Sequence, residues 1–266
     1  MKKNLLVLFC VVLNLSGYSH EDKNLNVGYE FIENKGQFDS KVSFLAKLRI
    51  GNMFLEKDRF TFDLFSAEDL MKRHNLDQDN MNTEKESDEL ILGRRNYQEK
   101  KAIKKHAYSM VFENALSNVY VDKRQEVLAY KNYYNGNDQS KWVNNVHSYK
   151  NVYYNNIYEN IDLDLYSSEE NMKYDIIIKP GGKLEDILLD YEGVDGLELK
   201  NNELIIKLST GEVKETGLFA YQLDEKNNRI QIPCKFKISG HKVSFILPNG
   251  YDKTRELIID PTWVFS

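Results

Sequence analysis

The fold is decided by residues 149–193, YKNVYYNNIYENIDLDLYSSEENMKYDIIIKPGGKLEDILLDYEG, where three short apolar runs follow one another with turns between them. In each run every second side chain is apolar, which is the pattern of a strand with one buried face. The apolar positions are Ile161, Leu163 and Leu165, then Met172, Tyr174, Ile176 and Ile178, then Ile187, Leu189 and Tyr191. Residues 167–171 form a polar segment of hairpin length, and Pro180-Gly181-Gly182 ends the second run because proline has no N–H for a ladder.

The same alternation of strand and turn extends over most of the chain. It begins in residues 29–64, resumes at 108–134 with a strong turn signal at Asn135-Gly136, and continues through 197–259. We expect roughly fifteen short strands, no helix longer than two or three turns, and no alternation of strands with helices. The sequence therefore predicts an all-β fold, either an antiparallel β-sandwich or two stacked sheets.

One long segment interrupts this pattern. Residues 69–104 are dense in charge and almost free of β-branched side chains. Ser66 is placed to cap a short helix that holds Leu70 and Met71, and the rest has no periodicity. Because such a composition buries too little apolar surface to offset the entropy of ordering, we expect a mobile, partly helical or disordered insertion.

The N-terminus has the three parts of a secretory signal peptide. Lys2 and Lys3 precede the apolar run LLVLFCVVLNL, and small and polar residues lead to a cleavage point near Ser19. The apolar run is shorter than the ~20 residues that a transmembrane helix needs. We therefore expect residues 1–19 to be removed, residues 20–28 to be a flexible lead-in, and 29–266 to form one exported β-rich domain at the cell surface or outside the cell, with no membrane span in the mature chain.

Cysteine usage and net charge indicate which disulfides and which binding partners the mature chain can have. Cleavage removes Cys10 and leaves Cys234, so no intramolecular disulfide is expected, and Cys234 shares an apolar row with Ile232 and Phe236 that favours a buried, unreactive thiol. The formal net charge is −5 and becomes more negative when the two lysines of the signal peptide are lost. A nucleic acid or an anionic membrane is therefore not expected as a partner, because both bind a concentrated basic face.

A series of short motifs resembles a known family when taken in order. The motifs are Phe31-Ile32-Glu33-Asn34-Lys35-Gly36-Gln37, Tyr134-Asn135-Gly136-Asn137 with Trp142, Val152-Tyr153-Tyr154, Ile157-Tyr158, Ile161-Asp162, Lys173-Tyr174-Asp175, Pro180-Gly181, Tyr191-Glu192-Gly193, Ala220-Tyr221-Gln222 and Ile259-Asp260-Pro261. Together they resemble the uncharacterised N-terminal domain of secreted bacterial proteins that carry seven-bladed β-propeller (SBBP) repeats and often a gliding-motility-associated C-terminal sorting domain.

The resemblance covers about residues 29–266 and departs from the family in two ways. Phe38 stands where tryptophan is usual, and the chain ends at Ser266 where the family continues into a propeller. We therefore expect either the severed N-terminal part of a longer protein or a stand-alone copy of its domain. The family domain has no established activity, so the resemblance implies no catalytic, cofactor-binding or metal-binding residue. The partners it implies are other domains of a longer chain, cell-surface proteins or glycans.

Two groups of residues are candidates for a functional site. Asp162 and Asp164 point the same way from one strand and are candidates for an acid–base pair or a cation site, although we expect them to be the solvent face of an amphipathic strand. The five histidines show no metal-ligand spacing. An aromatic-rich span is a candidate sugar-binding platform, although core packing is the more common use of such rings; it comprises Trp142, Tyr149, Tyr153, Tyr154 and Tyr158.

Two functions of different classes follow. The first is a non-enzymatic structural or interaction module of an exported, cell-surface-associated protein. It is favoured because the sequence shows no assembled catalytic constellation. The alternative is a secreted carbohydrate-binding or glycan-hydrolysing domain that uses Asp162, Asp164 and the neighbouring tyrosines. These functions are distinguished by whether the two carboxylates gather with other polar side chains in a concave pocket.

Overall fold

The protein is built almost entirely from antiparallel strands, as its sequence predicts. A computed structural model describes residues 28–74, 102–168 and 171–265. The expected signal peptide and most of the expected mobile insertion lie outside these residues. The strands are β1 (Phe31–Glu33), β2 (Phe44–Leu48), β3 (Gly51–Leu55), β4 (Arg59–Phe65), β5 (Lys105–Phe112), β6 (Tyr120–Tyr133), β7 (Val143–Tyr158), β8 (Ile161–Ser168), β9 (Asn171–Ile178), β10 (Leu189–Glu192), β11 (Gly196–Lys200), β12 (Glu203–Leu208), β13 (Gly211–Leu223), β14 (Arg229–Ile232), β15 (Lys235–Ser239), β16 (Lys242–Ile246) and β17 (Leu257–Phe265).

Helical structure is scarce in the described residues. Residues 67–74 are helical, and the Ser66 hydroxyl accepts a hydrogen bond from the Asp69 N–H at 3.2 Å, so the predicted cap is confirmed. Two single-turn 3₁₀ helices follow, η1 (Gln139–Lys141) and η2 (Leu184–Asp186). No helix of the described part is long and apolar enough to cross a membrane.

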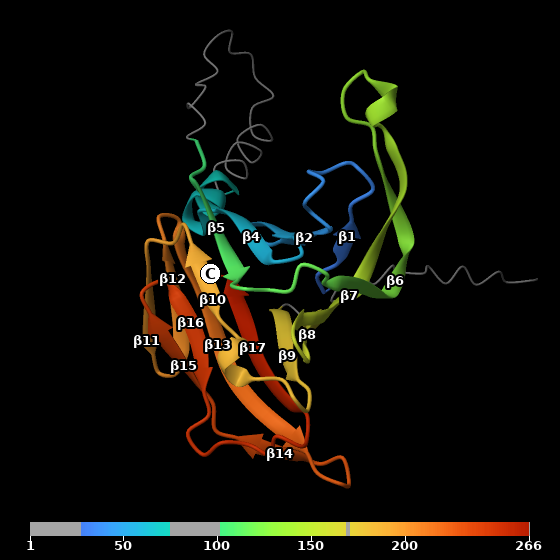
Figure 1. Ribbon diagram of the computed structural model, residues 1–266. Helices are drawn as coiled ribbons and strands as arrows, with labels where there is room; N and C mark the ends of the chain where they lie inside the picture. The colour runs from blue at the N-terminus through green and yellow to red at the C-terminus, as the bar shows by residue number, and fades with distance from the viewer. Residues whose placement is uncertain (1–27, 75–101, 169–170, 266) are drawn as a thin grey trace, which may run out of the picture.

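All strands belong to one continuous antiparallel sheet that curls until it is nearly a barrel (Figure 1). The order of its main strands is β15, β16, β10, β5, β4, β3, β2, β1, β7, β8, β9, β17, β13, β12, β11. The end strands β11 and β15 lie close to each other. Strand β6 pairs with β7, and β14 pairs with β13.

The all-β class is confirmed. The described strands form one sheet, however, and not two separate layers. Long strands change partners along their length and so join regions that a sandwich would keep apart. Strand β7 pairs with β1 through Ser148 and Tyr149 and with β8 through residues 151–158. Strand β13 has an irregularity between Thr216 and Phe219 opposite β17. Bulges of this kind bend a strand, which lets one sheet close on itself.

The inner face of the sheet holds the core. The predicted alternation is confirmed in β8 and β9, where Ile161, Leu163, Leu165, Met172 and Tyr174 are all fully buried. The core is rich in aromatic rings, and its largest fully buried side chains include Trp263, Tyr108, Tyr154, Tyr191, Phe31, Phe60 and Phe62. Cys234 is also buried, and burial raises the pKa of its thiol to about 12, as expected for an unreactive cysteine.

One hairpin leaves the body of the molecule. The second half of β6 and the first residues of β7, seen in yellow-green in Figure 1, rise away from the sheet and end in a loop that contains η1. We call residues 127–145 the arm. Asn135-Gly136 lies in its loop, and Gly136 has the expected positive φ of 69°, but the loop spans residues 134–142 and is not the tight turn that the sequence indicates. A small apolar cluster of Ile32, Leu45 and Val146 anchors the arm at its base.

Candidate functional site

The predicted carboxylate pair is divided between two environments. Asp162 is buried, with 1% of its surface exposed, so its assignment to a solvent face is wrong. Its Oδ2 accepts a hydrogen bond from the Tyr153 hydroxyl at 2.6 Å and pairs with Lys179 Nζ at 2.5 Å, while Oδ1 accepts from the Asn156 N–H at 2.9 Å. Tyr153 comes from β7 and Lys179 follows β9. These two side chains cover Asp162, which the alternation in β8 alone assigns to a solvent-exposed face.

The partners of Asp162 keep it ionised. Burial by itself raises the pKa of this carboxyl, but hydrogen bonds from Lys179, Tyr153 and Asn156 outweigh burial and hold the pKa below its usual value. All the donors around it belong to the protein itself. Asp162 is therefore a structural carboxylate that links β7, β8 and the end of β9, and its hydrogen bonds to the protein leave it poorly placed to act as a general base.

Asp164 belongs to a separate row of carboxylates on the outer face of the sheet. Its neighbour across the strand pair is Asp175, and the Asn151 amide donates a hydrogen bond to its Oδ1. Burial raises the pKa of Asp164. Asp175 lies between Asp164 and Asp260, and burial, followed by the charge of Asp260, raises its pKa to about 7.

Few counter-charges serve this row. Lys173 Nζ pairs with Asp260 at 2.8 Å, and the Tyr166 hydroxyl donates to Asp175 Oδ1 at 3.1 Å. Burial, and after it the like charges on neighbouring strands, disfavours ionisation of Asp175 and so raises its pKa to about 7. Within residues 28–74, 102–168 and 171–265, no group of three or more His, Cys, Asp or Glu is arranged to hold a metal ion.

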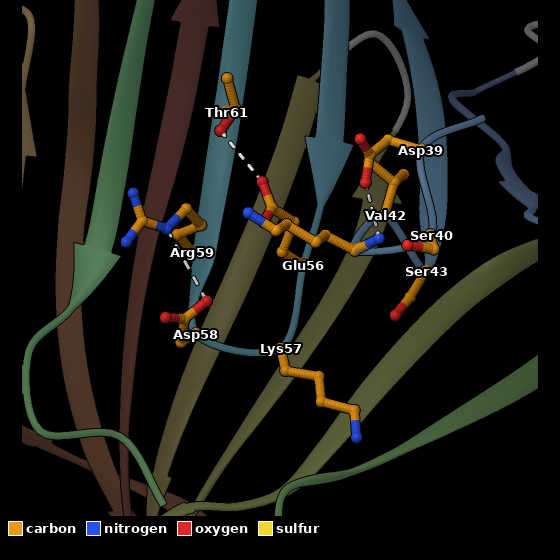
Figure 2. A pocket seen from close by; sticks show the side chains of 10 residues that line it. Asp39, Ser40, Val42, Ser43, Glu56, Lys57, Asp58, Arg59 and Thr61 are labelled. Atoms are coloured by element: carbon orange, nitrogen blue, oxygen red, sulfur yellow. Dashed lines mark hydrogen bonds and ion pairs between the residues drawn. The ribbon is translucent and has the colours of Figure 1, made fainter. Parts of the chain in front are cut away.

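Neither carboxylate of the pair lines the hollow shown in Figure 2. That hollow has a volume of about 680 Å³ and lies between the loop before β2 and the turn from β3 to β4. Some of its polar groups are paired: the Thr61 hydroxyl donates to Glu56 at 3.4 Å, and Arg59 pairs with Asp58 at 3.7 Å and with Glu192 at 3.2 Å. Lys41 and Lys57 also line the hollow.

Sequence reasoning missed a buried polar network at the centre of the core. Glu215 on β13 is fully buried and accepts hydrogen bonds from the Tyr174 hydroxyl at 2.6 Å, from Trp263 Nε1 at 3.0 Å and from the Tyr191 hydroxyl. Burial raises the pKa of Glu215, and the three hydrogen bonds oppose that rise. The Tyr108 hydroxyl is also buried and has no hydrogen-bond partner among the described residues.

One signal for this network was present in the sequence. Glu215 follows Val213 by two residues, so the two side chains share a strand face, and Val213 is fully buried. The network is closed off from solvent, since the rings that donate to Glu215 are themselves fully buried. It therefore offers no access to a ligand.

The aromatic span that the sequence indicates is also divided. Tyr149, Tyr154 and Tyr158 are buried in the core, as the core-packing interpretation expects. Tyr153 is half-buried beneath the Arg124 guanidinium, whose carbon lies 3.7 Å from the ring centroid. These four rings form no open platform.

Trp142 is separated from them, at the tip of the arm. Its ring meets that of Tyr134 edge to face, with centroids 5.2 Å apart. Tyr134 is 58% exposed and Trp142 37%, and further along the arm Tyr130 is 57% exposed and Leu128 is 100% exposed. The arm therefore carries the most exposed aliphatic side chain among the large apolar ones described, together with three open aromatic rings.

These features define the class of the protein: an all-β domain with a single curled antiparallel sheet, a closed aromatic core and a projecting arm that exposes several large apolar side chains. The chain belongs to the family described as Domain of unknown function (DUF7948), whose model matches residues 31–262. The match agrees with the uncharacterised domain that the sequence motifs indicate. No curated protein and no solved structure matches the chain.

Proposed function

We propose that this domain is a non-enzymatic interaction module of an exported, cell-surface-associated protein, and that the arm is its contact element. The observation that carries the proposal is that one hairpin, which projects from the sheet (Figure 1), exposes four large apolar side chains. They are Leu128, Tyr130, Tyr134 and Trp142. Large apolar side chains gathered on a projecting element mark interaction sites, whereas single exposed apolar residues are ordinary.

The shape of β6 supports a contact role for the arm. The register between β6 and β7 shifts between Glu126 and Tyr130, so residues 127–129 depart from regular pairing with β7. Bulges re-aim side chains and also protect a free strand edge from pairing at random. Here the irregularity presents Leu128 fully to solvent. We infer that the arm recognises a partner through side chains more than by addition of a strand.

The carboxylates support a non-enzymatic role over a hydrolytic one. A glycosidase needs two carboxyl groups that flank a substrate in a cleft. Asp162 is held by three donors of the protein itself, and neither it nor Asp164 lines the hollow in Figure 2. Export and attachment to the N-terminal side of a propeller are part of the proposal, and the sequence motifs and the signal-peptide pattern of residues 1–19 support them.

The proposal is tested with fluorescently labelled domain added to cells of the organism that encodes it. Leu128→Ser is compared with Ile230→Ser, which changes an apolar residue that is 46% exposed on β14, away from the arm. A third variant, the shortened arm, replaces residues 132–145 with Asn-Gly, which joins Lys131 to its register partner Val146 by a two-residue turn. It also carries Leu128→Ser and Tyr130→Ser, because these two exposed residues lie outside the deleted stretch.

We expect the shortened arm to abolish cell binding, Leu128→Ser to weaken it, and Ile230→Ser to leave it unchanged. Urea unfolding of each variant checks that the body is intact. Equal binding by the wild type and the shortened variant overturns the assignment of the arm. Release of reducing sugar from the cell-wall fraction by the purified domain supports the hydrolytic alternative instead.

A further inference from the structure

We infer that the tip of the arm, residues 134–142, binds carbohydrate through the rings of Tyr134 and Trp142. This inference rests on the proposed function and names the chemical class of ligand for one part of the arm. The tip has the sequence YNGNDQSKW, in which two aromatic residues enclose amide, hydroxyl and charged side chains and no aliphatic one.

The two rings are held in place before any ligand arrives. Trp142 Nε1 donates a hydrogen bond to the Gly136 carbonyl at 3.2 Å, which fixes the indole across the loop. The Tyr134 ring meets it at an interplanar angle of 65°. Asp138 caps η1, with its Oδ1 accepting from the Ser140 N–H at 3.1 Å and from the Ser140 hydroxyl at 2.6 Å. A preorganised ring loses little freedom on binding, which favours affinity.

The surroundings of the rings favour a sugar over an apolar protein surface. A pyranose ring offers a C–H face that packs on an aromatic ring and an edge of hydroxyl groups that donate and accept hydrogen bonds. Asn135, Asn137 and Gln139 are exposed beside the rings, and amide side chains both donate and accept. A protein partner with an apolar pocket is the better match for Leu128, which lies outside the tip.

The sequence supplies a direct spectroscopic test, because it contains two tryptophans that differ completely in exposure. Trp263 is fully buried, whereas Trp142 is 37% exposed, so quenching of tryptophan emission by acrylamide reports on Trp142. The probes are soluble hexasaccharides of β-1,4-glucose, β-1,4-N-acetylglucosamine, β-1,3-glucose and α-mannose, together with muropeptides from peptidoglycan.

We expect at least one probe to protect Trp142 from acrylamide in a saturable way. For that probe, isothermal titration calorimetry should show about tenfold or greater loss of affinity in Trp142→Ala and in Tyr134→Ala, since each removes a stacking face. Trp142→Phe should retain most of the affinity. Tyr130→Ala is the matched control, because Tyr130 is equally exposed on the same arm but lies outside the tip, and its affinity should equal that of the wild type.

The failure of this inference differs from the failure of the proposed function. If no probe protects Trp142, or if Trp142→Ala binds the sugar as the wild type does, the carbohydrate site is wrong. Cell binding that is lost in Leu128→Ser and kept in Trp142→Ala then identifies a protein partner and leaves the proposed function standing. Cell binding that survives the shortened arm overturns both.

Discussion

The interior around Glu215 and the arm use the same kinds of residue in opposite ways. In the interior, Tyr174, Tyr191 and Trp263 bury their rings completely and direct their polar atoms at one carboxylate. On the arm, Tyr130, Tyr134 and Trp142 leave much of their ring surface in water. Aromatic content alone therefore does not identify a core or a binding surface.

This difference in burial indicates which residues stabilise the domain and which are available to bind a partner. Rings that lose water on folding stabilise the folded state, while rings that stay in water contribute little until a partner covers them. Variants in the interior should therefore change the free energy of unfolding, and variants on the arm should change binding alone.

Truncation of Tyr174 should have the largest effect. The ring is fully buried and stacks on Trp263 with centroids 4.3 Å apart, and its hydroxyl donates to Glu215. Tyr174→Ala should cost about 3–5 kcal/mol in the free energy of unfolding, which leaves little of the ~5–15 kcal/mol that holds most domains together. Urea denaturation followed by circular dichroism measures it.

Tyr174→Phe separates the two contributions of that side chain. It keeps the ring and removes one of the three donors to the buried carboxylate, so we expect a smaller loss of roughly 1.5–3 kcal/mol. A loss below 1 kcal/mol for Tyr174→Ala would contradict the view that the interior carries the stability.

The row of outer carboxylates should make stability depend on pH. The pKa of Asp175 is about 7 in the folded protein because of burial and the nearby charge of Asp260, whereas an unfolded aspartate titrates near 3.9. A raised carboxyl pKa means that the folded state binds the extra proton between these values. The stability that this group contributes should therefore be fully present below about pH 4 and should be lost as the pH rises to about 7.

The size of this effect and its assignment are both testable. The fall is at most about 4 kcal/mol and smaller after solvent screening, because Asp175 is not fully buried and also faces Asp164, Tyr166 and Lys173. Asp175→Asn should flatten the profile of unfolding free energy against pH and raise stability at pH 8. A profile unchanged by Asp175→Asn would assign the dependence to another group.

The two carboxylates of β8 should differ when each is removed. Asp162→Ala leaves the Tyr153 hydroxyl and the Asn156 N–H without their acceptor, so it should cost roughly 1–3 kcal/mol. Asp164→Ala removes a carboxylate whose pKa burial raises, and its stability should change by less than about 1 kcal/mol. Parallel urea titrations compare the two variants. Equal losses would show that the three donors to Asp162, from Tyr153, Asn156 and Lys179, add no net stability.

The surroundings of Asp162 also show how much of the structure could be predicted from the sequence. Alternation placed Ile161, Leu163 and Leu165 correctly in the core, because burial on one face leaves a period of two in the chain itself. It misplaced Asp162, because what covers the other face comes from Tyr153 and Lys179, which no local pattern links to β8.

Long-range pairing also explains the remaining errors. The sequence indicated the strands but not that β7 and β13 change partners along their length, which turns two expected layers into one sheet. It did not flag Glu215, since an acidic residue between Lys214 and Thr216 resembles a solvated turn until Val213 is noticed on the same face. The tip of the arm was only partly predicted. The family motif already set Trp142 beside Tyr134, but as a candidate site Trp142 was grouped with tyrosines of β7, whereas the structure packs its ring against Tyr134.

The smallest effect on stability is expected at the most exposed apolar residue. Leu128 is 100% exposed, so its side chain buries no surface when the chain folds, and Leu128→Ser should change the free energy of unfolding by less than about 0.5 kcal/mol. Urea denaturation at two protein concentrations a hundredfold apart measures this. A loss above 1 kcal/mol that grows with concentration would show that Leu128 is covered by a second copy of the domain, since association stabilises by mass action. The arm would then be a self-association element, and the contrast between a stabilising interior and a recognition arm would no longer hold.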